Sequence, residues 1–131
     1  MAKICTSIEQ SKRLIELRLD VNTADMCYKC LGEDPYDLIV RPYSDWKEKY
    51  KGLLISGDAN VIPAWSLSTL LELIPNLDER SPILCRNMRE NKWWVFYLST
   101  AVDAVIQTVC YDNPLDAVFE MICLLKENKK M

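Results

Sequence analysis

Two cysteines separated by two residues, Cys27 and Cys30, are the pair whose residue type and spacing most suggest chemistry. Two thiolates at this spacing supply half of a four-cysteine zinc site, or the reactive pair of a thiol–disulfide catalyst. The chain contains no second Cys-x-x-Cys pair, and no strand is predicted directly before Cys27, where a redox motif would need one. Metal or redox chemistry at Cys27 and Cys30 is therefore the alternative hypothesis, and we expect no bound metal and no cofactor.

The absence of histidine excludes several classes of enzyme. Histidine is the usual general base near neutral pH and the commonest metal ligand in proteins. Without it there is no Ser-His or Cys-His nucleophile pair and no zinc site of mixed Cys/His type. The chain also has only 3 glycines, so it lacks a glycine-rich phosphate-binding loop. We expect a protein that is not an enzyme and has no catalytic residues.

Carboxylates are frequent in the middle of the chain. Clustered carboxylates can bind Ca²⁺ or Mg²⁺, but the spacing of this cluster matches no calcium-binding loop. A solvated acidic surface is the better interpretation. The six residues are Glu33, Asp34, Asp37, Asp45, Glu48 and Asp58.

Aromatic side chains also occur in this polar stretch. Trp46 lies between Tyr43 and Tyr50 among charged residues that lack the period of a core helix. Exposed aromatic side chains mark contact surfaces in many proteins. Two interpretations stay open, because the three rings either bind a partner or cover one edge of a sheet. Tyr43, Trp46 and Tyr50 are the candidate partner surface, whereas the remaining tryptophans are expected in the core.

Length and composition predict one soluble domain over residues 1–131. The chain is 50% hydrophobic and 27% charged, as in ordinary globular proteins. Its formal net charge of −3 argues against nucleic-acid binding. The sequence becomes polar by Ser7, and no run approaches the roughly 18 apolar residues of a membrane span. We therefore expect a cytoplasmic protein with reduced cysteines and no membrane association.

Capping signals predict where the first helix begins. Thr6 with Glu9 and Ser7 with Gln10 form two overlapping capping boxes, in which a hydroxyl binds an exposed backbone N–H. The helix is expected to end near Arg18. Because no glycine follows, that boundary is poorly defined by the sequence.

Two further helices are predicted by the same reasoning. Ser66 is the expected N-cap of the second helix, and Pro75 ends it. Asn113 followed by Pro114 begins the third, which residues 127–130 close with cations in its last turn. The apolar face of this last helix is broader than a single buried stripe.

The segment between the second and third helices predicts an antiparallel β-meander, with strands at 82–86, 93–98 and 104–111. Both pleat faces of the middle strand are apolar, whereas a sheet with one solvated face alternates with polar residues. We therefore predict an α+β fold in which an antiparallel meander of three or more strands carries helices on both faces, similar to an α/β/α sandwich.

Residues 23–62 give weaker signals. Short strands are candidates at 38–40 and 53–55, a helical turn at 45–50, and a turn at 57–60. Nearly 40 residues without a strong period would be long for a loop in a compact domain, so additional structure is expected there.

Three stretches carry a resemblance to other proteins: residues 4–11 with 19–26, residues 62–67 and residues 111–117. Together they resemble a family of short uncharacterised proteins from gut Bacteroides-type bacteria and their phages or mobile elements. The element order at the C-terminal end is also similar to small phage-associated ABA-sandwich domains. The resemblance implies a phage or mobile-element origin. Neither family carries an assigned activity, so no functional residues are transferred.

The leading hypothesis is a non-catalytic interaction or accessory module with an unknown protein partner. A homodimer is also expected, because the third helix and the middle strand present more apolar surface than a chain of this length is expected to cover, and symmetric dimers are the commonest oligomers. The predicted dimer interface uses part of the C-terminal helix, around Met121 and Leu124, or the adjoining sheet.

Overall fold

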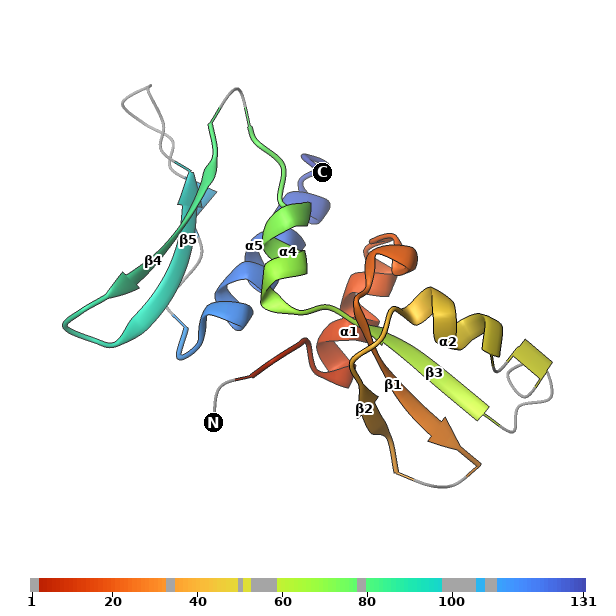
Figure 1. Ribbon diagram of the computed structural model, residues 1–131. Coiled ribbons are helices and arrows are strands. Elements are labelled where there is room, and N and C mark those ends of the chain that lie inside the picture. Colours follow the sequence, from red (N-terminus) through yellow and green to blue (C-terminus); the bar gives the residue numbers. More distant parts are fainter. Residues whose placement is uncertain are drawn as a thin grey trace. The chain divides into compact units, whose positions relative to one another are not determined.

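The computed structural model describes residues 3–32, 35–49, 51–52, 59–77, 80–97, 106–107 and 111–131. The chain divides into two compact units: an N-terminal unit, Cys5–Thr69, and a C-terminal unit, Leu70–Met131 with Met1–Ile4. Each unit contains an antiparallel sheet of three strands together with helices (Figure 1). The predicted α+β class is therefore confirmed. The division into one domain stays a prediction, and each unit is described by itself.

The sheet of the N-terminal unit has the strand order β2-β1-β3. β1 is Met26–Leu31, β2 is Asp37–Ile39 and β3 is Ala59–Ala64. Only β2 was among the predicted strands. The expectation of a turn at 57–60 is wrong at its described end, because Ala59 and Asn60 belong to β3. β1 lacks alternation of apolar and polar residues because both of its faces are covered.

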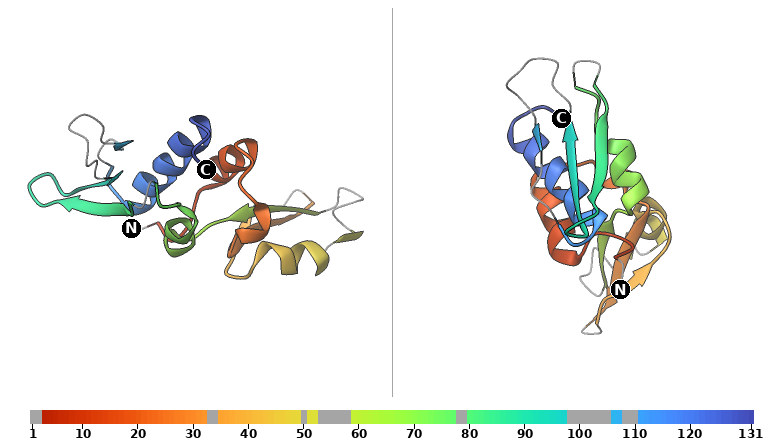
Figure 2. Two further views of the ribbon diagram at one scale, coloured as in Figure 1. Left: turned by 90° about the horizontal axis from the view of Figure 1, so that it is seen from above. Right: turned by 90° about the vertical axis from the view of Figure 1, so that its left-hand side faces the viewer.

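Helices cover both faces of this sheet. α1, Ile8–Glu16, contacts β3, and α2, Tyr43–Lys49, contacts both β1 and β3. Successive side chains of β1 point to opposite faces. The Tyr28 hydroxyl donates to the carbonyl of Thr6, which precedes α1, whereas Cys27 faces Tyr43 of α2. The left view of Figure 2 shows the two helices on opposite sides of the strands.

Trp65, directly after β3, is fully buried and holds the chain ends of this unit together. Its carbonyl accepts from the Thr6 N–H at 2.9 Å, and its own N–H donates to the Thr6 hydroxyl at 3.1 Å. The indole N–H donates to the Thr23 hydroxyl at 2.9 Å. The next residue, Ser66, donates its N–H and hydroxyl to the Asp25 carboxylate. The carbonyl, the backbone N–H and the indole N–H of the buried tryptophan therefore all have hydrogen-bond partners.

Of the two predicted capping boxes, the one formed by Ser7 and Gln10 is present. The Thr6 hydroxyl instead contacts Ser11 and Trp65. α1 ends at Glu16 in a Schellman motif, in which the Leu19 N–H binds the Leu14 carbonyl and the Arg18 N–H binds the Ile15 carbonyl. Residue 18 adopts the left-handed conformation, φ 66°, that glycine usually supplies.

Replacing Arg18 by glycine tests this helix end. An L side chain in the left-handed region is strained, and glycine removes that strain at some cost in unfolded-state entropy. We expect Arg18→Gly to be more stable than Arg18→Ala by about 1 kcal/mol, measured by urea denaturation. The alanine variant is the matched control because it removes the same side chain but keeps the strain. Equal stabilities would contradict the assigned conformation.

The C-terminal unit contains the predicted meander. Its strand order is β4-β5-β6, with β4 at Pro82–Asn87, β5 at Lys92–Tyr97 and β6 at Ile106–Gln107. The first two strands confirm the prediction within a residue or two. Of the third, residues 106–107 pair with β5, Tyr111 forms a bridge with Trp93, and residues 104–105 and 108–110 lie outside the described residues.

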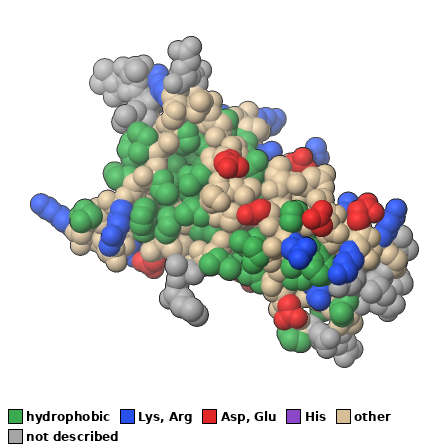
Figure 3. All heavy atoms as spheres, in the orientation of Figure 1, with side chains coloured by type: hydrophobic (Ala, Val, Ile, Leu, Met, Phe, Trp, Pro, Cys, Tyr) green, Lys and Arg blue, Asp and Glu red, His purple; other side chains and the backbone are tan. Residues whose placement is uncertain are grey.

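The two faces of β5 differ in burial. Val95 and Tyr97 are 0% and 3% exposed, and the Tyr97 hydroxyl donates to the Pro75 carbonyl at 2.7 Å. Trp94 and Phe96, on the opposite pleat face, are half-buried, with ring centroids 5.4 Å apart. Figure 3 shows hydrophobic side chains gathered over β5 and the neighbouring α5. The expectation that Trp93 and Trp94 are core residues holds only in part.

α4, Leu67–Leu73, begins after Ser66, whose hydroxyl accepts from the Thr69 N–H. α5, Pro114–Glu127, begins after Asn113, whose side chain accepts from the Asp116 N–H, as predicted. α5 contacts β5 and has eight buried residues. Met121 is fully buried within the single chain, so a substitution at that position would test folding rather than association. The homodimer through this helix or the adjoining sheet stays a prediction.

Replacement by phenylalanine at two tryptophans compares two buried indole N–H groups. One has a hydrogen-bond partner, and the other has none in the described part of the chain. Trp65→Phe removes a hydrogen bond to Thr23 from a fully buried site, and we expect it to destabilise the protein by about 1–3 kcal/mol. The buried Trp94 Nε1 has no hydrogen-bond partner in the described part of the chain, so Trp94→Phe should cost about 1 kcal/mol or less. Denaturant unfolding measures both, and equal losses would refute the distinction.

Candidate functional site

The segment that follows β2 places the strongest candidate site on α2. Arg41 and Pro42 connect β2 to the helix, and the Tyr43 N–H donates to the Ala24 carbonyl at 3.2 Å, which fixes the start of α2 against the sheet. Asp45 lies in the first turn, and Lys47 and Lys49 in the last. This order of charges complements the helix dipole and stabilises a short helix.

Two lysines contact the ring of Trp46. The Lys49 Nζ lies 4.7 Å from the ring centroid and comes from the same helix, three residues later. The Lys29 Nζ lies 5.4 Å from the centroid and comes from β1. Both distances are within the range of cation–π attraction, worth about 0.5–1 kcal/mol each at an exposed site. The half-buried ring is therefore held between the sheet and its own helix.

Trp46 also lines a pocket that is open to solvent. The lining residues are Arg41, Asp45, Trp46 and Lys49, and the cavity volume is about 330 Å³. We call this group, together with Lys29, the Trp46 surface. It carries three cations and one carboxylate. Figure 3 shows basic, acidic and hydrophobic side chains interspersed over this part of the N-terminal unit.

The structure separates the three aromatic residues of the predicted partner surface. Trp46 lines the pocket, whereas Tyr43 is half-buried toward β1. Burial raises the pKa of Tyr43 above its usual value, and the neighbouring Cys27 adds to the increase. Tyr50 lies outside the described residues. Tyr43 therefore packs toward the sheet, whereas Trp46 keeps an accessible part, and the partner surface stays a prediction.

Sequence reasoning missed the cations of this surface. The spacing of Trp46 and Lys49 on one helix was an available signal, because residues three apart share a helix face. Lys29 is brought in only by the sheet. Of the three described carboxylates of the expected acidic surface, Asp37, Asp45 and Glu48, only Asp45 lines the pocket, whereas Glu33, Asp34 and Asp58 lie outside the described residues.

The pair Cys27 and Cys30 lies within β1, on a strand rather than at a helix start. Three residues of strand separate the two Cα atoms by about 10 Å and turn the side chains to opposite faces. A disulfide needs Cα atoms roughly 4.4–6.8 Å apart, so this pair cannot close without moving the backbone. The two sulfur atoms are equally unsuited to bind one metal ion.

The environment of each thiol agrees with this geometry. Burial raises the pKa of the Cys27 thiol to about 11, despite the nearby Lys29, so the reactive thiolate is scarce at neutral pH. The Cys30 Sγ donates to the Gly32 carbonyl at 3.5 Å. In the described part of the chain there is no group of three or more residues suited to hold a metal ion. These observations disfavour the metal or redox alternative.

The other cysteines that the structure describes, Cys5, Cys85 and Cys123, form no disulfide with one another or with the Cys27–Cys30 pair. Among the helices in the described ranges, none combines the length and the apolarity needed to cross a bilayer.

Comparison of the chain with protein-family models, with curated proteins and with solved structures finds no significant match.

Mild oxidation tests the strand placement of the two thiols. When the folded protein is treated with diamide, we expect no disulfide between Cys27 and Cys30, because the strand holds their Cα atoms too far apart. Peptide mapping by mass spectrometry, without reduction, makes the measurement. The same treatment in concentrated urea is the control and should allow the pair to join. Rapid formation of this bond in the folded protein would refute the placement and restore the redox hypothesis.

Proposed function

We propose that this protein is a non-catalytic interaction module that binds a protein partner through the Trp46 surface. The observation that carries the proposal is an accessible tryptophan, held in place by Lys29 and Lys49, at an open pocket beside the exposed Arg41. Tryptophan and arginine are the residue types most enriched among the energetically dominant residues of protein interfaces. A ring that is already fixed loses little conformational entropy when a partner packs against it.

The proposed lack of catalysis and the proposed origin rest on the sequence. The chain has no histidine and offers no general base of the usual kind, which favours binding over catalysis. A phage or mobile-element origin is supported by the resemblance of three stretches alone. A cytoplasmic location is supported by thiols that form no disulfide among the described cysteines. A homodimer remains a prediction, and the half-buried Trp94 and Phe96 make the adjoining sheet its better interface.

Affinity capture with matched variants tests the proposed surface. The full chain, Trp46→Ala and Tyr36→Ala are immobilised and exposed to lysate of the cells that encode the protein, and retained proteins are quantified by mass spectrometry. Tyr36 is the control because it is also a partly exposed aromatic residue of the same unit, 36% exposed. We expect a partner that the parent and Tyr36→Ala retain and that Trp46→Ala loses by roughly tenfold or more, about 1.4 kcal/mol.

Circular dichroism establishes that each variant is folded. If Trp46→Ala is destabilised, the exposed Arg41→Glu replaces it, because that residue contributes to the pocket without being part of the core. Retention of the same proteins at the same level by parent, Trp46→Ala and Arg41→Glu would show that the surface does not bind a partner.

A further inference from the structure

We propose that the partner presents an acidic segment, whose carboxylate side chain binds Arg41 and Lys49 while a neighbouring apolar side chain packs on Trp46. This inference rests on the proposed function and specifies the chemistry of the partner. Its evidence is the charge of the pocket, the occupation of the tryptophan ring by lysines, and the size of the cavity.

The charge of the pocket favours an anion. Among the described residues, Arg41 and Lys49 line it together with one carboxylate, Asp45, and Lys29 adds a third cation over the ring. Arg41 is exposed and forms no ion pair in the described part of the chain. Its planar guanidinium group is therefore accessible for a bidentate hydrogen bond to a carboxylate. The surface therefore complements an acidic side chain.

The tryptophan ring argues against a basic partner. Aromatic cages recognise ammonium groups by cation–π attraction to an open ring face. Here two ammonium groups of the protein already lie within 5.4 Å of the Trp46 centroid. A third cation would meet like-charge repulsion from Lys29, Lys49 and Arg41. An apolar side chain can pack on the ring while an adjacent carboxylate pairs with the cations.

The cavity is sized for side chains of a protein rather than for a nucleic-acid strand. Its volume, about 330 Å³, is at the lower end of ligand pockets and accommodates one or two side chains. Single-stranded nucleic acids need an extended basic groove with several stacking aromatic residues. The whole chain has a net charge of −3, which disfavours a polyanion of high charge density.

Selection from a random peptide library tests the inference. The immobilised full-length chain is the target, and the selected peptides are sequenced and measured by fluorescence anisotropy. We expect enrichment of Asp or Glu next to an apolar or aromatic residue. Affinity for a selected acidic peptide should fall roughly tenfold in Arg41→Glu and in Lys49→Glu, and should weaken as salt concentration rises.

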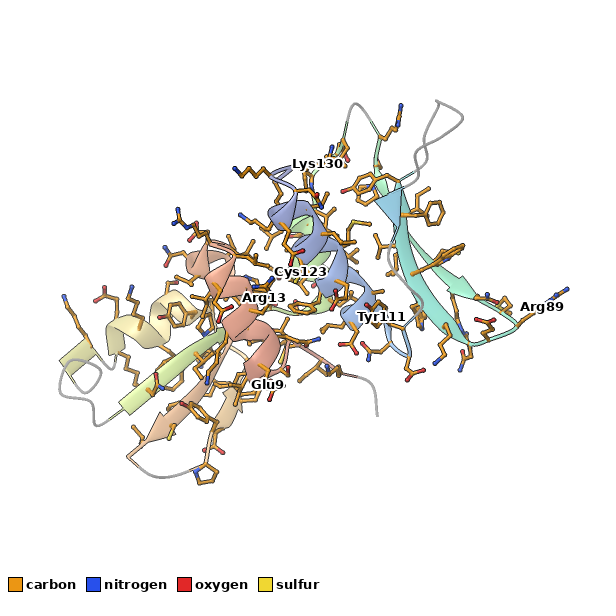
Figure 4. The ribbon with its side chains drawn as sticks, turned by 180° about the vertical axis from the view of Figure 1, so that it is seen from behind. Glu9, Arg13, Arg89, Tyr111, Cys123 and Lys130 are labelled. Carbon is orange, nitrogen blue, oxygen red and sulfur yellow. The ribbon has the colours of Figure 1, made fainter. Side chains whose placement is uncertain are left out.

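The control variant is Arg89→Glu, which makes the same change of charge at the tip of the β4–β5 hairpin in the C-terminal unit (Figure 4). It should bind the selected peptide as the parent does. If Arg89→Glu loses as much affinity as Arg41→Glu, the binding reflects net charge only, and the inference fails.

The remaining outcomes separate the inference from the function on which it rests. Selected peptides that are neutral or basic but lose binding in Trp46→Ala would overturn the acidic partner and leave the interaction surface intact. Acidic peptides that bind Trp46→Ala and Arg41→Glu as well as they bind the parent would overturn the surface itself. A single-stranded oligonucleotide that displaces the selected peptide at about 0.15 M salt would show that the pocket recognises phosphate rather than a protein carboxylate. Failure to enrich any peptide would count against both.

Discussion

The N-terminal unit depends on the hydrogen bonds that surround the buried Trp65. Thr6 and Trp65 are far apart in the sequence. The Thr6 N–H donates to the Trp65 carbonyl, the Trp65 N–H donates to the Thr6 hydroxyl, and the indole N–H donates to the Thr23 hydroxyl. A large ring in a close-packed interior fixes its neighbours, and an unsatisfied N–H there would cost about 1–3 kcal/mol. These bonds join the start of α1, the segment before β1 and the end of β3, so they fix the sheet at one end.

The Trp46 surface follows from that arrangement. β1 is held by its neighbours so that Lys29 points to the same face as Cys27, and α2 lies across this face. The start of α2 is bound to Ala24, the residue before Asp25. The Trp46 ring consequently contacts Lys29 of the sheet and Lys49 of its own helix. Arg41 and Asp45 stay exposed beside it. A rigid support is what allows a single accessible ring to contribute to binding without a large loss of entropy.

Local signals predicted the elements that local interactions determine. The Ser7–Gln10 box, the Asn113 cap and the strands around the Asn91 turn involve residues close in sequence, and all are present. The end of α1 was harder to predict, because the left-handed position carries arginine instead of glycine. β1 and β3 were missed because a strand with two covered faces loses the alternation by which strands are recognised. The same error led Cys27 and Cys30 to be considered as a reactive pair, since their spacing has meaning only once the backbone conformation is known.

The sequence by itself determined the α+β class, the capped helices, the meander and the absence of histidine chemistry, because composition and local patterning carry that information. It also indicated Trp46 as an aromatic residue in a polar setting. Only the tertiary structure decided that Tyr43 packs on the sheet, that Lys29 meets Trp46 across two elements, and that the two thiols of β1 face apart. The reason is physical: pairing of strands distant in sequence decides which side chains become neighbours, and a shift of one residue in register reverses every face.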